Sequence, residues 1–192
     1  MKYIFFDTET TGLPTGPHSA YWKWPRIVQI AWLLADEDEN IISKNNLLVR
    51  PNGYTIPDRV IKIHGITNEK ASSEGVSVEH ALHQFLSDTN YADTLVAHNV
   101  AYDYGVVRGE LLRKNIPDFL RKHNRFCTMT AKPVLDFCKS FRANGSRNCP
   151  SLSELYYLLF GKRFSNAHDA FADTEACAKC FFKLKKMGLL EL

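Results

Sequence analysis

Two acidic residues, separated by a single residue, lie near the N-terminus, where the apolar run "YIFF" ends. They are Asp7 and Glu9 of "FFDTETTG". Strand side chains alternate between faces, so both carboxylates point the same way if the strand continues through Thr10. Two like charges this close repel each other, and one takes up a proton unless a cation lies between them. An isolated pair of acids could also lie on an exposed loop. Further acids are therefore needed before a metal site can be inferred.

Two more acids are expected at the edges of buried elements. Asp103 lies beside the apolar stripe of a predicted helix over 99–114 and should face inward or towards its rim. Asp173 heads an apolar series that continues through Cys177 to Leu184 at helical spacing. A carboxylate in such a place should either pair with a cation or bind metal, although each acid alone could be partly exposed.

Two histidines accompany these acids. His168 precedes Asp173 by five residues, which would place them roughly 140° apart on one helix. We therefore expect His168 in the "FSNAH" loop before the helix, where it can reach a bound substrate or simply lie on the surface. His98 and Asn99 fall at a strand-to-helix junction, the usual position of ligands in open α/β sheets. Asn99 is also expected to cap the helix that follows.

Taken together, these residues indicate one chemistry. Four carboxylates suit hard divalent cations such as Mg²⁺ or Mn²⁺. Two such ions, about 4 Å apart, can stabilise the entering and leaving oxygens of a phosphodiester displacement. A neutral histidine can accept a proton from the attacking water.

The elements that must position these residues follow from the apolar pattern. Strands are predicted at 2–6, 26–36, 40–51, 94–98 and 125–130. Helices are predicted at 77–88, 99–114, 131–139, 151–160 and 169–187, and a short helix within 56–67 that Gly65 ends. The first three strands are joined by short connections and should be largely antiparallel, whereas the later strands alternate with helices. The pattern predicts an α/β fold, a mixed sheet with helices packed on its faces, in a single domain over 1–192.

Composition bounds the class of protein. The 192 residues are 45% hydrophobic and 23% charged with a net charge of +3, typical of one soluble globular domain. No apolar stretch approaches a membrane span, and no export signal is visible, so we expect a cytoplasmic location. Five cysteines are then expected as free thiols. The "CAKC" at 177–180 lies mid-helix without a second ligand pair, which favours core cysteines over zinc.

Three segments resemble the motifs of the DEDDh family of 3′–5′ exonucleases: "FFDTETTGL", "LVAHNVAYD" and "HDAFAD". That family includes proofreading exonucleases of bacterial replicative polymerases, ribonuclease T, oligoribonuclease and three-prime repair exonucleases. The intervening "WPRIVQIAW" and "IPDRVIKIHGIT" resemble its connecting segments, and the likeness spans about residues 3–182. The resemblance implies a ribonuclease H-like fold with a mixed five-stranded sheet flanked by helices.

The resemblance also implies a role for each catalytic residue. Asp7 would bridge two divalent cations, Mg²⁺ or Mn²⁺. Glu9 and Asp173 would complete the shell of the first ion, and Asp103 would hold the second. His168 would be the general base that deprotonates the attacking water.

A pocket for the 3′-terminal nucleotide is implied as well. The backbone from Thr8 to Leu13 would cup this nucleotide, with Thr10 bonding its sugar and Leu13 packing on its base. The "HN" pair would line the same pocket. The expected substrate-binding residues are Thr8, Thr10, Gly12, Leu13, His98 and Asn99.

The implied reaction is hydrolysis at the 3′ end of single-stranded nucleic acid, releasing nucleoside 5′-monophosphates. DNA is slightly favoured, because the connecting segments look closer to the proofreading type, and RNA or short oligoribonucleotides are the alternative. A non-catalytic nucleic-acid-binding protein and an internally cutting nuclease are further alternatives. The chain ends about 19 residues after Asp173, which favours a free-standing exonuclease; a DNA polymerase partner and a homodimer stay open.

Two stretches combine positive charge with other features. "GPHSAYWKWPR" at 16–26 could be a substrate-binding flap, or Trp24 could fix the loop to the core with Trp22 incidental. The basic stretch 139–151 could contact the substrate backbone or be a solvated loop.

Overall fold

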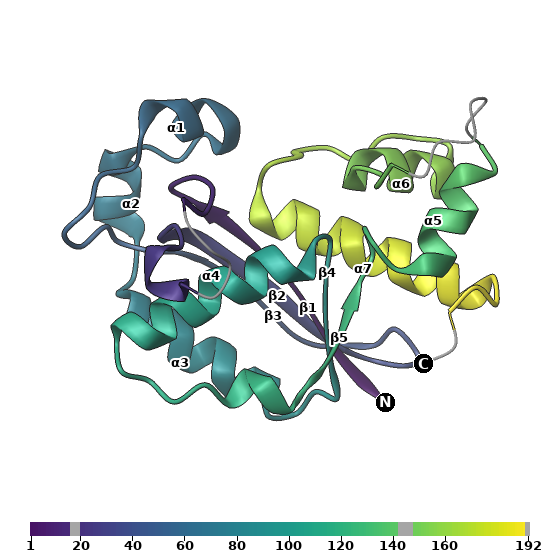
Figure 1. Ribbon diagram of the computed structural model, residues 1–192, viewed down its shortest axis with the longest axis horizontal. Helices are drawn as coiled ribbons and strands as arrows, with labels where there is room; N and C mark the ends of the chain where they lie inside the picture. The colour runs from purple at the N-terminus through teal and green to yellow at the C-terminus, as the bar shows by residue number, and fades with distance from the viewer. Residues whose placement is uncertain (16–19, 142–147, 191–192) are drawn as a thin grey trace.

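The structure is a computed structural model that describes residues 1–15, 20–141 and 148–190. A five-stranded sheet forms its centre (Figure 1), in the order β3-β2-β1-β4-β5. The strands are β1 (Lys2–Thr10), β2 (Ile27–Asp36), β3 (Ile41–Leu48), β4 (Thr94–Ala97) and β5 (Asn124–Cys127). The helices are α1 (Asp58–His64), α2 (Asn68–Glu74), α3 (Val78–Thr89), α4 (Val100–Arg113), α5 (Lys132–Lys139), α6 (Leu152–Phe160) and α7 (Ala170–Lys186), with short 3₁₀ turns η1 (Tyr21–Lys23) and η2 (Phe119–Lys122).

The sheet is mixed, as expected from the lengths of the connections. The hairpin strands β1, β2 and β3 pair antiparallel, whereas β4 pairs parallel with both β1 and β5. The parallel pairs are those separated in sequence by helices, because a parallel return needs a crossover. The predicted α/β architecture is confirmed.

Alternate residues of β1 pack into two hydrophobic cores, one on each face of the sheet. Ile4 and Phe6 pack with α3 and α4 on one face, and Tyr3 and Phe5 pack with α7 on the other. All four side chains are at most 1% exposed. Figure 1 shows the same layers, with α3 and α4 on one side of the sheet and α5, α6 and α7 on the other. The strand in the middle of the sheet is therefore fixed on both faces.

Several predicted boundaries were wrong. The short helix expected within 56–67 ends at Gly65, as predicted, because this residue adopts a left-handed φ of 73°. The next helix, α2, which Thr67 caps, was not predicted. The third strand ends at Leu48 and the fifth at Cys127, both earlier than expected. The first strand, predicted at 2–6, runs on to Thr10, and this places Asp7 and Glu9 on one face of the sheet.

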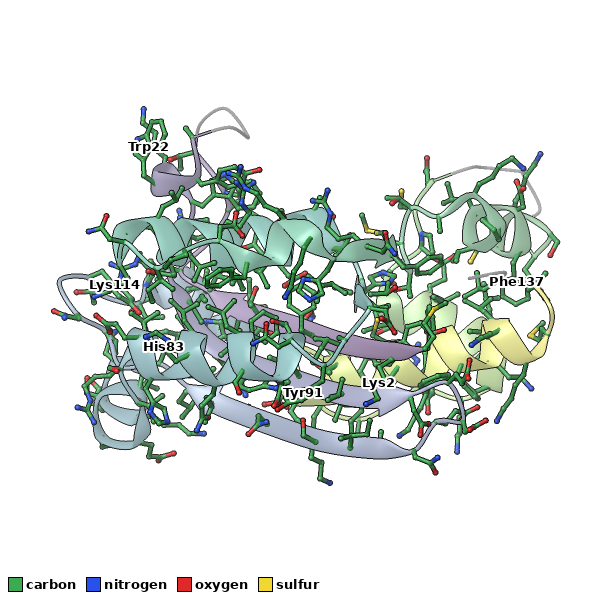
Figure 2. The ribbon with its side chains drawn as sticks, turned by 90° about the horizontal axis from the view of Figure 1, so that it is seen from below. Lys2, Trp22, His83, Tyr91, Lys114 and Phe137 are labelled. Atoms are coloured by element: carbon green, nitrogen blue, oxygen red, sulfur yellow. The ribbon has the colours of Figure 1, made fainter. Side chains whose placement is uncertain are left out.

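Trp24 fixes its segment to α4, as one of the two interpretations held. Its side chain is 5% exposed, and a Cβ added at Gly105 would lie only 2.1 Å from its ring. Gly109 likewise leaves room for the backbone of Tyr21. Trp22 is 63% exposed and projects on the outer side of α4 (Figure 2). Residues 16–19 of this stretch and 142–147 of the basic stretch lie outside the described residues.

The cysteines are free thiols, and both cysteines of "CAKC" are buried in α7. The expectation of core cysteines is confirmed. Among the helices that the structure describes, none has the length and apolar character needed to cross a membrane.

Candidate active site

Three of the expected acids meet above the α7 face of the sheet. Asp7 and Glu9 occupy alternate positions of β1, so both point to the face that carries Tyr3 and Phe5. One carboxylate oxygen from each of Asp7, Glu9 and Asp173 lies within 4.8 Å of the other two. Asp173 follows Glu9 by 164 residues in the sequence, and the packing of α7 on β1 brings the two acids together.

The start of α7 places Asp173. The helix begins at Ala170 because the Oδ1 of Asp169 accepts a hydrogen bond from the backbone N–H of Ala172 (3.0 Å), a side-chain N-cap. Asp173 then lies in the first turn, and its Oδ2 accepts a bond from the backbone N–H of His168 (3.3 Å). Its Oδ1 is buried and has no hydrogen-bond partner among the described residues.

Asp103 approaches from the other side of β1. It is 2% exposed in the first turn of α4, and its Oδ1 accepts bonds from the N–H and the hydroxyl of Thr8 (3.0 and 2.7 Å). It does not belong to the group of three oxygens described above. Its charge nevertheless acts on that group, because after burial it contributes most to raising the pKa of Asp7.

Burial and mutual repulsion shift all four acids in one direction. Burial is the main cause in each case. The pKa of Asp7 is raised well above its usual range, that of Glu9 to about 8, that of Asp103 to about 7 and that of Asp173 to about 6. Carboxylates in this state are poorly stabilised by the protein alone. A bound cation would favour their charged form and would give the Asp173 Oδ1 a partner, so this donor set fits a hard divalent metal.

His168 lies at the rim of the acidic cluster. It is exposed, and it adopts a left-handed φ of 70° directly before the cap of α7. His168 was predicted to lie in the "FSNAH" loop before the helix, and it does lie before the start of α7. The backbone bond to Asp173 ties its position to that of the acids.

A cavity of about 300 Å³ adjoins the acids. It is lined by Thr8, Glu9, Thr10, Gly12, Leu13, Val60, Ile63, His64 and Tyr102. The side chains of Leu13 and Ile63 are 76% and 57% exposed, so two large apolar groups are presented to a ligand. Four of the expected substrate-binding residues therefore lie on this cavity: Thr8, Thr10, Gly12 and Leu13.

Four lining residues were missed from the sequence: Tyr102 and, from α1, Val60, Ile63 and His64. The Tyr102 hydroxyl lies 2.6 Å from both the Thr10 Oγ1 and the Gly12 carbonyl oxygen, which fixes the turn after β1. Ile63 and His64 come from the end of α1. Tyr102 could have been found, since it directly precedes Asp103, whereas α1 offers no chemical signal of its own.

The structure does not bring His98 to this cavity. Its Nε2 donates to the carbonyl of Pro150 and its Nδ1 pairs with the hydroxyl of Thr128, both at 3.0 Å. Burial lowers the pKa of His98 to about 4, so the ring is neutral at pH 7. The histidine thus links β4 to the segment that precedes α6. Asn99 occupies the N-cap position of α4, as expected, but its backbone is left-handed (φ 82°) and its side chain makes no capping hydrogen bond.

A fifth acid near the site, Asp169, was not predicted from the sequence. Its charge helps to raise the pKa values of Asp7, Glu9 and Asp173. Its Oδ2 accepts a bond from the Nε2 of Gln29 on β2 (3.0 Å). In "HDAFAD" it directly follows His168. Its role as the N-cap of α7 becomes visible only where the structure shows that this helix begins at Ala170.

A family model described as "Exonuclease" (RNase_T) matches residues 4–181. The chain is 30% identical to DNA polymerase III subunit epsilon of Buchnera aphidicola, covering 96% of this chain and 82% of that protein. It is 26% identical to human three-prime repair exonuclease 1, covering 90% of this chain and 60% of that protein.

Solved structures give the same fold. A zinc-bound complex of Escherichia coli exonuclease I with single-stranded DNA superposes with a TM-score of 0.74 at 25% identity, covering 97% of this chain. The match covers 40% of the exonuclease I chain. This chain therefore spans about two fifths of that enzyme, and likewise only 24% of a Rhodobacter capsulatus epsilon-like protein.

Proposed function

The chain belongs to the exonuclease family, and from this premise we propose that it is a metal-dependent 3′–5′ exonuclease. It would hydrolyse the terminal phosphodiester bond of single-stranded nucleic acid, DNA in preference to RNA, and release nucleoside 5′-monophosphates. The observation that carries the proposal is the meeting of acids from β1 and α7, within the electrostatic reach of Asp103 on α4, beside the cavity that Leu13 and Ile63 line.

The acids have the donors for two divalent cations, Mg²⁺ or Mn²⁺. Asp7, Glu9 and Asp173 would hold one ion, and Asp103 would contribute with Asp7 to a second. When bound, such ions activate water and neutralise the charge that develops on the phosphate oxygens. The raised pKa values support this assignment, because a cation removes the cost of keeping these carboxylates charged.

His168 would accept the proton of the attacking water. Its ring is solvent-exposed at the rim, so it can receive a proton there and pass it to bulk water. The bond from its backbone N–H to Asp173 keeps the histidine beside the acids.

The cavity supports action at a chain end. Its walls include Thr10 and Gly12, held by the Tyr102 hydroxyl, next to the exposed Leu13. A sugar placed there would lie against the polar groups of Thr10 and Gly12, and a base would lie against the apolar side chain of Leu13. Apolar contact and stacking tolerate every base, so the proposed enzyme has weak sequence preference.

The preference for DNA rests on relatives. The exonuclease I complexes contain single-stranded DNA, and the Buchnera relative is a polymerase subunit. By the same reasoning a DNA polymerase is the proposed protein partner. RNA is the second candidate substrate, because none of the described contacts to Thr10 or Gly12 discriminates against a 2′-hydroxyl.

The test compares nucleotide release from matched DNA and RNA oligomers, labelled at the 5′ end, in Mg²⁺ and then Mn²⁺. We expect ladders that shorten from the 3′ end, faster on DNA, and no cutting of a circular single strand. Asp7→Asn should abolish release while circular dichroism remains that of the folded protein, and Asp38→Asn, in an exposed turn, should leave it unchanged. A wild-type protein that binds the oligomers without releasing nucleotides would refute the proposal.

A further inference from the structure

Gln29 is a buried polar residue directly beside the acids. It lies on β2 opposite Glu9, with which it is paired in register, and is 3% exposed. Opposed residues on neighbouring strands point to the same face, so Gln29 also faces α7. A buried amide at this position is costly unless its donors and acceptor are all satisfied.

The amide of Gln29 meets that requirement through three bonds. Its Nε2 donates to the Oδ1 of Asn46 on β3 (2.8 Å) and to the Oδ2 of Asp169 (3.0 Å). Its Oε1 accepts from the backbone N–H of Ala170 (3.2 Å). Two of the three bonds therefore go to consecutive residues at the start of α7.

Those two residues immediately follow His168. Asp169 uses its other oxygen to cap α7, so one carboxylate joins the helix start to the sheet. His168 itself is exposed and has a left-handed backbone, and its ring has no hydrogen bond or ion pair among the residues the structure describes. Apart from the bond of its backbone N–H to Asp173 (3.3 Å), this histidine is held in place through the two residues that follow it.

We propose that Gln29 is a positioning residue for His168: it fixes residues 169–170 to β2 and thereby sets the distance of the histidine from the acids. This inference rests on the proposed function, in which His168 takes the proton of the attacking water. Proton transfer requires close and aligned groups, and a misplacement of about 1 Å can cost roughly 100-fold in rate. Gln29 does not line the cavity that would take the terminal nucleotide, so its loss should leave substrate binding intact.

The test measures kcat and KM for release from a single-stranded DNA oligomer at saturating Mg²⁺. Gln29→Leu removes all three bonds at similar volume. Gln29→Glu is the second variant, which keeps an acceptor for Ala170 but replaces the donor to Asp169 with a like charge. We expect kcat to fall about 10- to 100-fold in both, with KM within about twofold of wild type. Asn46→Ala is the matched control, since it removes only the outer bond, and should keep kcat within about twofold.

A double-mutant cycle separates positioning from general damage. In a His168→Ala background, measured by single-turnover kinetics with enzyme in excess, Gln29→Leu should cause less than about a twofold further loss, because its effect passes through the histidine. Full kcat in both Gln29 variants, or a loss that multiplies with that of His168→Ala, would overturn the inference. A wild-type protein that releases no nucleotide would instead refute the proposed function, so the two failures are distinguishable.

Discussion

Removing one charge from the acidic cluster should stabilise the metal-free protein. In the folded state the pKa of Glu9 is raised from 4.5 to about 8, mainly by burial and then by the charge of Asp173. A rise of about 3.5 corresponds to an upper limit of about 5 kcal/mol at high pH, at about 1.4 kcal/mol for each pKa unit. The amide in Glu9→Gln is buried in turn, which costs roughly 1–2 kcal/mol. The net expected gain at pH 8 is therefore about 3 kcal/mol.

The sign of the pH dependence follows from the raised pKa. Below pH 4.5 the carboxyl of Glu9 is protonated in both folded and unfolded states, so wild type pays no penalty. As the pH rises towards 8 the unfolded state ionises first, and the folded state loses stability relative to it. At pH 5 this penalty is below about 1 kcal/mol, less than the cost of the buried amide, so Glu9→Gln should be no more stable than wild type there and should gain its advantage as the pH rises towards 8.

The assay is urea unfolding in EDTA at both pH values, followed by circular dichroism. Asp38→Asn, at an exposed turn, is the control and should change little. Addition of Mg²⁺ should reverse the order at pH 8, because wild type gains binding energy that Glu9→Gln loses. A variant no more stable than wild type at pH 8 in EDTA would refute the argument that the cluster is strained without a cation.

Further predictions concern the core and the cavity. Phe181→Ala should lower the free energy of unfolding by about 3–5 kcal/mol, because the ring is fully buried between Tyr3 and Phe5, as urea titration would detect. Leu13→Ala should leave thermal unfolding unchanged, since the side chain is 76% exposed, yet raise KM for an oligomer severalfold; an unchanged KM would remove this residue from the proposed binding site. Gly105→Ala should destabilise the protein by about 1–3 kcal/mol despite alanine's higher helix propensity, and calorimetry showing a higher melting temperature would contradict the close contact described above.

The sheet could be predicted from the sequence, and the four acids could be singled out, because both depend on local signals. Apolar runs mark the strands. Short connections between strands indicate antiparallel pairing, and connections that contain a helix indicate parallel pairing. The acids stood out since Asp7 and Asp173 begin or end such apolar patterns. These features need only the order of residues along the chain.

What the sequence could not supply depends on contacts between distant segments. His98 looked like a pocket residue beside Asn99, but its partners Thr128 and Pro150 lie 30 and 52 residues away. Asp169 and Gln29 are 140 residues apart, and neither carries a signal of its own. The helix α2 (Asn68–Glu74) was missed because Ala71 is its one buried residue, so it shows no apolar stripe.

The two glycines of α4 have a consequence for how the protein acquires its active site. Each interior glycine weakens an isolated helix by about 1 kcal/mol relative to alanine, so α4 gains much of its stability from the Trp24 segment that docks against it. Asp103 is carried by the first turn of that same helix. The place of the second proposed metal ligand set therefore depends on the docking of a segment from the N-terminal third of the chain, and a change that loosens Trp24 should also displace Asp103.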